Sequence, residues 1–363
     1  MAIEATSERD MYEKMKTLLA EIVPDAELRI KAEIAYEINR LKTEKNALIL
    51  GHNYMEPALY HTVPDIVGDS LELSRRAAET DKPLIVFLGV HFMAETAKIL
   101  NPEKTVLIPS PKAGCSLAES ITAEDVRHLR AAFPGAPVVA YVNTSADVKA
   151  ESDICCTSSN AAKVVAGLDA ETVIFIPDAY LARNVAKETG KRVIAPIRPD
   201  DNESNGARTT RAQAVNPQKG AAIVAWHGRC EVHERFTVQD IERIRAQFPD
   251  VVILAHPECR PDVVAAADFS GSTSAMIRYV KETEAPRYLL LTECSMGDNI
   301  AAENPHKTML RLCSVRCPHM NQITLENTLD ALRHHRYEVD VPEPMRARAV
   351  RALERMLAVG CQR

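Results

Sequence analysis

Three segments of the chain repeat one pattern of apolar and polar positions. In each, an apolar run of strand length ends in polar residues, and a helical pattern that opens with a small hydroxyl residue follows. This residue lies 18 positions after His52 in the first segment, and 17 positions after Tyr141 and His256 in the other two. The runs are ALILGHNY (47–54), VVAYVN (138–143) and VVILAHPE (251–258), and the hydroxyl residues are Ser70, Ser158 and Thr273. The spacing predicts three copies of one βα plan.

The copies continue in register. A second apolar run follows at 84–90, 172–178 and 288–294, and a third at 105–110, at 193–197 or 221–227, and at 308–313. Each third run leads to a cysteine, and seven residues beyond each cysteine a threonine precedes an amphipathic helical pattern; the pairs are Cys115 with Thr122, Cys230 with Thr237, and Cys317 with Thr324. Threonine at an N-cap accepts hydrogen bonds from first-turn amides, so we predict three capped helices.

Strands that alternate with helices form parallel sheets, which predicts an α/β protein of three related small parallel α/β domains. The expected parts are N-terminal helices at 1–45, α/β domains at 46–118, 119–232 and 233–320, and C-terminal helices at 321–363. The polar, aperiodic segment 198–220 reads as an insertion in the second domain. A pseudo-threefold arrangement would direct the three sets of strand ends at one another.

Composition narrows the class of protein. Lys and Arg total 44 against 50 Asp and Glu, a net charge of −6, which gives no support to a nucleic-acid partner. No apolar run approaches the roughly 20 residues that cross a bilayer, and the N-terminus lacks signal-peptide features, so we expect a cytoplasmic protein without a membrane partner. Nine cysteines, an odd number, argue against a disulfide framework and leave core thiols, metal ligands or catalysis.

Sites in parallel sheets lie at the carboxyl ends of the strands. The residues at these ends are His52, Asn53, Tyr54, Tyr141, Asn143, His256 and Glu258. One thiolate from each copy suits a [4Fe–4S] cluster that leaves one iron open as a Lewis acid; these cysteines are Cys115, Cys230 and Cys317. Zinc is the rival metal, although the paired spacing of structural zinc sites is lacking, apart from Cys313 and Cys317.

Other residues predict the substrate chemistry. Helix starts with hydroxyls at Ser70, Ser158 and Thr273 are either ordinary caps or binding sites for carboxylate and phosphate groups. No glycine-rich nucleotide motif is present, so an anionic small molecule is expected. Acid–base candidates are His52 and His256, which occupy equivalent strand ends, His233, which follows a proposed ligand cysteine by three residues, Tyr54 and Glu258.

The chain resembles the quinolinate synthase family, the A protein of de novo NAD biosynthesis. The likeness extends from about residue 47 to 330 and rests on the following segments: GHNY (51–54), GDSLELS (68–74), GVHFMAETAKIL (89–100), AGCSLAE (113–119), YVNTSADVKAESD (141–153), CTSSNA (156–161), WHGRCEVHERF (226–236), HPEC (256–259), GST (271–273), TE (292–293) and CPHM (317–320). The insertion at 198–220 and the additional cysteines Cys294 and Cys313 depart from the family pattern.

The resemblance implies a triangular, pseudo-threefold fold around a [4Fe–4S] cluster held by Cys115, Cys230 and Cys317. It implies condensation of iminoaspartate with dihydroxyacetone phosphate to quinolinate, with loss of phosphate and water, and a functional link to L-aspartate oxidase. The implied substrate contacts are His52, Tyr54, Ser70, Tyr141, Asn143, Ser158, His233, His256, Glu258 and Thr273. Tyr54 and Glu258 would transfer protons, supported by His52 and His256. Two alternatives stay open: another [4Fe–4S] hydro-lyase acting on a small dicarboxylate, and a non-enzymatic iron–sulfur sensor.

Overall fold

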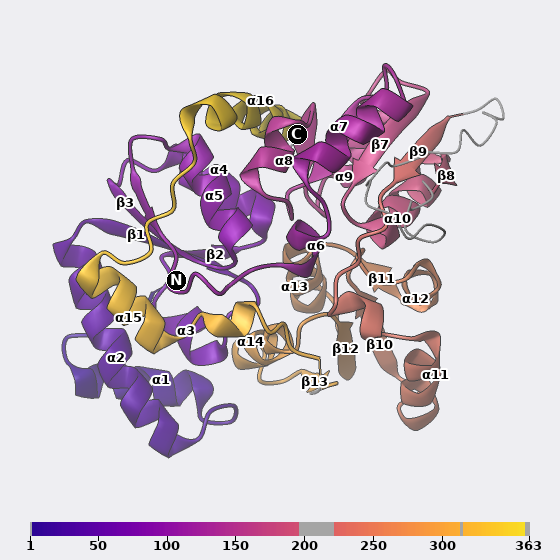
Figure 1. Cartoon of the computed structure of the whole chain (residues 1–363). Coiled ribbons are helices and arrows are strands. Elements are labelled where there is room, and N and C mark those ends of the chain that lie inside the picture. The colour runs from indigo at the N-terminus through magenta and orange to yellow at the C-terminus, as the bar shows by residue number, and fades with distance from the viewer. Residues whose placement is uncertain (1, 196–220, 313–314, 360–363) are drawn as a thin grey trace, which may run out of the picture. The chain divides into compact units, whose positions relative to one another are not determined.

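The structure is a computed structural model that describes residues 2–195, 221–312 and 315–359 (Figure 1). The chain divides into two compact units. Unit 1 combines Met1–Cys115 with Glu231–Asp340, and unit 2 combines Ser116–Cys230 with Val341–Arg363. Unit 1 therefore holds the first and third sequence repeats, and unit 2 holds the second.

Each repeat forms one parallel sheet, which confirms the predicted α/β class with three related sheets. The first sheet has the order β2-β1-β3-β4, with β1 Ala47–His52, β2 Ile66–Gly68, β3 Leu84–Leu88 and β4 Thr105–Leu107. The third has the matching order β11-β10-β12-β13, with β10 Val251–Ala255, β11 Phe269–Ser270, β12 Arg287–Leu291 and β13 Thr308–Leu310. All described strand pairs within these sheets are parallel.

The second sheet has five strands in the order β6-β5-β7-β9-β8. They are β5 Val138–Tyr141, β6 Ile154–Cys156, β7 Thr172–Ile176, β8 Arg192–Ile194 and β9 Ala222–Ala225. The sequence left open which of two runs is the third strand of this repeat. Strand β9 takes that position beside β7, and β8 adds a further edge strand. The insertion at 198–220 lies outside the described residues.

Three helices alternate with the strands of every repeat. They are α3 Pro57–Thr62, α4 Ser70–Glu79 and α5 His91–Leu100 in the first; α8 Ala146–Ala150, α9 Ala161–Ala166 and α10 Ala179–Thr189 in the second; and α12 Pro261–Ala266, α13 Thr273–Glu282 and α14 Ser295–Glu303 in the third. Covering helices bury both faces of a parallel sheet, which explains why all six residues of β1 are buried.

The remaining helices open, link and close the repeats. They are α1 Glu8–Leu19, α2 Asp25–Glu44, α6 Ser116–Glu119, α7 Ala123–Ala132, α11 Val238–Gln247, α15 Leu325–His334 and α16 Glu343–Val359. In unit 1, α1 and α15 both pack against α2 (Figure 1). In unit 2, α16 packs against α8 and β6. Among the described helices, none has the length and apolar character to cross a membrane.

The predicted threonine caps are confirmed. The side chains of Thr122, Thr237 and Thr324 each accept a hydrogen bond from the third backbone N–H of the helix that follows. After Thr122 and Thr237, the third helical residue is an aspartate whose side chain accepts a hydrogen bond from the backbone N–H of the threonine, which completes a capping box.

An aspartate in each repeat holds the start of the edge strand, a feature that we did not predict. Its carboxylate accepts a hydrogen bond from a backbone N–H of the neighbouring strand at 2.7 or 2.8 Å, and a Lys or Arg side chain pairs with it. The aspartates are Asp65, Asp153 and Asp268, with strand donors Ile49, Val138 and Ile253 and basic partners Lys42, Arg130 and Arg245. This shared device supports the triplication independently of the cysteines and threonines.

Candidate active site

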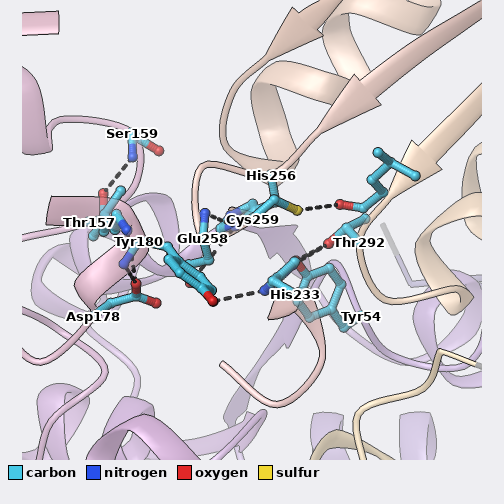
Figure 2. A network of polar contacts seen from close by, with 12 residues as sticks. Tyr54, Thr157, Ser159, Asp178, Tyr180, His233, His256, Glu258, Cys259 and Thr292 are labelled. Carbon is cyan, nitrogen blue, oxygen red and sulfur yellow. Dashed lines mark hydrogen bonds and ion pairs between the residues drawn. The ribbon is translucent and has the colours of Figure 1, made fainter. Parts of the chain in front are cut away.

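Unit 1 brings the strand ends of its two sheets together. Asn53, directly after β1, donates from Nδ2 to the Oγ1 of Thr273, the first residue of α13, at 2.9 Å. Figure 2 draws the polar side chains that gather near these ends, including Tyr54, His233, His256, Glu258 and Thr292. Each of the side chains involved is less than a tenth exposed: His52, Asn53, Tyr54, His233, His256, Glu258, Thr273 and Thr292.

His52 and His256 occupy equivalent positions and have the same local geometry. The backbone N–H two residues later, of Tyr54 or of Glu258, donates to the Nδ1 of each ring at 3.3 Å. An imidazole nitrogen that accepts a hydrogen bond carries no proton, so this network assigns the proton of each neutral ring to Nε2. Burial lowers the pKa of His52 to about 4; burial, followed by the nearby His233, lowers the pKa of His256 to about 3. Near pH 7 both rings are neutral and can donate from Nε2.

His233 links a carboxylate to a hydroxyl. It begins the short 3₁₀ turn His233–Arg235, and its ring stacks on that of His256 with centroids 4.5 Å apart. Its Nδ1 lies 2.9 Å from Glu258 Oε2, and its Nε2 lies 2.9 Å from Thr292 Oγ1. Because an ionised carboxylate only accepts, the Nδ1 of a neutral ring carries the proton, and Nε2 accepts from the threonine hydroxyl.

The series continues to a phenol. The Tyr54 hydroxyl is hydrogen-bonded to Thr292 Oγ1 and lies 3.5 Å from the Nε2 of His233. We call Glu258, His233, Thr292 and Tyr54 the buried array. A carboxylate that orients an imidazole, which in turn contacts a hydroxyl, is an arrangement by which enzymes take up and release protons.

The N-termini of α4 and α13 are joined by their own caps. Asp69 caps α4 by accepting from the N–H groups of Leu71 and Glu72 at 3.1 Å, and its other oxygen accepts from the Ser272 hydroxyl at 3.0 Å. Ser272 in turn caps α13. The predicted helix-opening hydroxyl residues, Ser70 and Thr273, are thus the first helical residues and not the caps.

Unit 2 carries the remaining predicted contacts. Tyr141 is the last residue of β5 and is buried, and the Asn143 Oδ1 is buried without a hydrogen-bond partner in the described part of the chain. Ser158 does not open a helix, contrary to the prediction, because α9 begins at Ala161. Residues 157–160, directly before α9, form a turn in which Thr157 N–H donates to the Asn160 side chain and Thr157 Oγ1 accepts from Ser159 N–H.

The three predicted ligand cysteines, Cys115, Cys230 and Cys317, are half-buried, and so is Cys294. Cys155 and Cys156 in β6, and Cys259 between β10 and α12, are buried. Cys115 and Cys317 belong to unit 1, and Cys230 is the last residue of the first segment of unit 2. The backbone N–H of Met320 donates to the Cys317 Sγ at 3.5 Å. Burial raises the pKa of the Cys317 thiol to about 11, and this N–H···S contact opposes that rise. Three cysteine sulfurs are a ligand set compatible with an iron–sulfur cluster. Cys313 and Cys361 lie outside the described residues.

Thr292 was missed by the search for polar strand ends because its counterparts are not polar. It follows β12 directly, and the residues directly after the equivalent strands are Gly89 and Pro177. The next residue, Glu293, is fully buried, and burial raises the pKa of its carboxyl group to about 7. Its carboxylate accepts from the backbone N–H of Ser295 at 2.8 Å. A rule that inspects every strand end, repeated or not, would have found both residues.

Comparison with known proteins gives a consistent result. The sequence profile of the family described as "Quinolinate synthetase A protein" matches residues 36–358. A quinolinate synthase of Xylella fastidiosa (strain 9a5c) is 54% identical over 332 residues, covering 91% of this chain and 89% of the relative. Quinolinate synthase 2 of Mesorhizobium japonicum is 53% identical over 319 residues, covering 88% and 89%. A quinolinate synthase of Agrobacterium fabrum is 49% identical over 356 residues, covering 98% and 93%.

Proposed function

Since the chain belongs to the quinolinate synthetase A protein family, enzymes of NAD biosynthesis, we propose that it condenses iminoaspartate with dihydroxyacetone phosphate to quinolinate, releasing phosphate and water. The observation that carries this proposal is the buried array, in which Glu258, His233, Thr292 and Tyr54 are joined by successive contacts. Isomerisation, ring closure and dehydration each need protons moved between carbon, nitrogen and oxygen. An array that ends in a phenol and a carboxylate contains groups that can give a proton to substrate and groups that can take one from it.

We assign proton transfer to Tyr54 and Glu258, with His233 between them. When Tyr54 takes a proton from substrate, its own hydroxyl proton can pass to Thr292 Oγ1, and the hydroxyl proton of Thr292 can pass to the Nε2 of His233, along the existing hydrogen bonds. Glu258 keeps the proton of His233 on Nδ1, so that Nε2 stays an acceptor. His52 and His256, neutral and protonated on Nε2, act as hydrogen-bond donors to substrate oxygens.

The substrate's anionic groups are assigned to the hydroxyls near the helix starts. Ser70 and Thr273 stand at the first positions of α4 and α13, where the helix dipole favours carboxylate or phosphate. The N–H groups of Leu71, Glu72 and Ala275 are already bonded to the caps, so the hydroxyls are the proposed donors. Ser158, Tyr141 and Asn143 complete the proposed set. The Asn143 Oδ1, which is buried without a partner in the described chain, supports an additional donor supplied by substrate.

The proposed cofactor is a [4Fe–4S] cluster held by Cys115, Cys230 and Cys317. When bound, it would supply one iron without a protein ligand, a Lewis acid for a hydroxyl that is to leave as water. The half-buried side chains and the N–H···S contact to Cys317 support this donor set. We place the reaction in the cytoplasm and next to L-aspartate oxidase, because oxidation of aspartate yields the iminoaspartate that this reaction consumes.

The test is an anaerobic assay of the purified, iron-loaded chain with iminoaspartate and dihydroxyacetone phosphate. We expect quinolinate and inorganic phosphate in equal amounts, and no product when either substrate is omitted. Absence of quinolinate from iron-loaded protein would contradict the proposed reaction. Dehydration of another small dicarboxylate by the same protein would favour a different hydro-lyase. A colourless, iron-free chain with full activity would refute the cofactor.

A further inference from the structure

Asn299, in the middle of α14, reaches from the third repeat to the first. It is 2% exposed, and its Nδ2 donates two hydrogen bonds, to the backbone oxygen of Asn53 at 3.2 Å and to that of Met55 at 2.9 Å. These two carbonyls stand immediately before and after Tyr54. A single amide group therefore holds the main chain on both sides of the phenol of the buried array.

The other contacts of this turn explain why such a clamp matters. The N–H of Tyr54 donates to His52 Nδ1 at 3.3 Å, and the N–H of Met55 donates to the His52 oxygen at 3.0 Å. Both bonds are local and move with the turn. The bonds from Asn299 instead anchor the turn to α14, a helix of the third repeat that begins three residues after Thr292. They thus link the backbone of Tyr54 to the helix that follows Thr292, the residue to which the Tyr54 hydroxyl is hydrogen-bonded.

We propose that Asn299 is a positioning residue that holds Tyr54 at hydrogen-bond distance from Thr292 for proton transfer. The inference rests on the proposed function for the identity of the reaction, but the clamp itself does not. The amide orientation follows from the contacts, since only Nδ2 can donate to two carbonyl oxygens. A shift of about 1 Å in a reacting group lowers a rate on the order of 100-fold, so loss of the clamp reduces turnover while the fold persists.

The first test uses Asn299→Asp, which keeps the size but puts an acceptor against two carbonyl oxygens, and Asn299→Ala, which removes the donors and leaves space. Asn304→Asp is the matched control, because Asn304 ends the same helix, is also buried, and donates within it to Ile300. We expect backbone amides in a peptide covering 50–58 to exchange with deuterium on the order of tenfold faster in both Asn299 variants only. Unchanged exchange in both, with wild-type melting behaviour, would overturn the clamp.

The second test separates positioning from a general loss of stability. We expect kcat to fall on the order of 100-fold in Asn299→Asp, and far less in the control at similar melting temperature. In a Tyr54→Phe background, Asn299→Asp should lower kcat less than threefold, because the hydroxyl that Asn299 positions is absent. Full additivity of the two substitutions would refute action through Tyr54. Wild-type protein that makes no quinolinate, with exchange still altered in the variants, would refute the proposed function and leave the clamp standing.

Discussion

The buried array is costly for the fold unless its members satisfy one another. A polar group taken out of water without a partner destabilises a protein by roughly 1–3 kcal/mol. Here Glu258, His233, Thr292 and Tyr54 are all buried, and each has a partner in the array. Low local polarity also strengthens such bonds and orients them. The hydrogen bonds of the array are therefore in place without a bound substrate, as the proposed proton transfer over short distances requires.

Thr292 is the member whose importance is easiest to isolate. We expect Thr292→Val, which keeps the shape but removes the hydroxyl, to lower kcat about 100-fold, because one proton-transfer contact typically supplies 10²–10⁴-fold. Thr292→Ser should restore most of the activity, since it returns the hydroxyl.

Thr96→Val serves as the control. Thr96 is equally buried, but its hydroxyl bonds to the Phe92 oxygen within α5 and stands outside the array. Steady-state kinetics with iron-matched samples provide the measurement. Equal activity of Thr292→Val and the control would contradict the role of Thr292.

The buried histidines predict how stability depends on pH. His52 and His256 have pKa values of about 4 and about 3 in the folded chain, against about 6.5 for unfolded histidine. Between pH 6.5 and 4 the unfolded chain therefore binds more protons than the folded chain, so the free energy of unfolding falls as the pH falls through this window. Each histidine accounts for up to about 2 kcal/mol of loss between pH 7 and 5.

Urea unfolding of the wild type and of His52→Asn and His256→Asn at pH 7, 6 and 5 measures this effect. Each substitution should flatten the dependence, because one group that takes up a proton on unfolding is removed. Parallel profiles for the wild type and both variants would show that these rings are not neutral in the folded protein.

At the scale of elements, caps decide where helices begin and aspartates decide where edge strands begin. The threonine caps were predictable because a cap bonds to N–H groups two or three residues away and leaves a local signature. The same logic placed Ser158 at a helix start and was wrong. There, Thr157 and Asn160 form a side-chain turn that delays the helix to Ala161.

Asp268 tests the strand device. We expect Asp268→Ala to lower the free energy of unfolding by roughly 1–3 kcal/mol, because it removes the carboxylate that accepts from the N–H of Ile253 and pairs with Arg245. Asp250→Ala is a matched control: Asp250 forms an ion pair of similar exposure with Arg287. Exposed pairs contribute at most about 1 kcal/mol. Urea denaturation should rank the variants in this order, and the reverse ranking would contradict the role of the strand contact.

At the scale of the whole molecule, the two sheets of unit 1 face one another through their strand ends. Residues more than 200 positions apart meet there, as in the bonds from Asn53 to Thr273 and from Asn299 to Met55. The buried array depends on this pairing, because Tyr54 comes from the first repeat and Thr292 from the third. Neither repeat alone contains the complete array.

The proposed cluster ligands are also a property of the whole chain, since one comes from each repeat. We expect Cys115→Ala, Cys230→Ala and Cys317→Ala each to abolish the bound iron and the brown colour of anaerobically purified protein, because each would remove a cluster ligand. Cys313→Ala and Cys259→Ala should keep both. Iron analysis and the visible absorption spectrum provide the measurements. Retention of the cluster in Cys317→Ala together with its loss in Cys313→Ala would reverse the ligand assignment.

From the sequence alone, the triplication, the alternation of strands and helices, the threonine caps and the register of three cysteines could be read. These are periodic or local properties, and repetition within one chain made them visible without any relative. Even the equivalence of His52 and His256 followed from their shared position behind a buried strand, and the shared Nδ1 contacts agree with it.

Only the tertiary structure decided which strand ends meet and which side chains complete them. The residues equivalent to Thr292 in the other repeats, Gly89 and Pro177, are not polar, and the contact of Thr292 with Tyr54 spans 238 residues. The bond from Asn299 to Asn53 spans 246 residues. Nor did periodicity show that Asp69 and Ser272 join two helix ends across 203 residues. Such contacts depend on how complete sheets pack, because the free energy that selects the packing is summed over many buried side chains and is not encoded in any short segment.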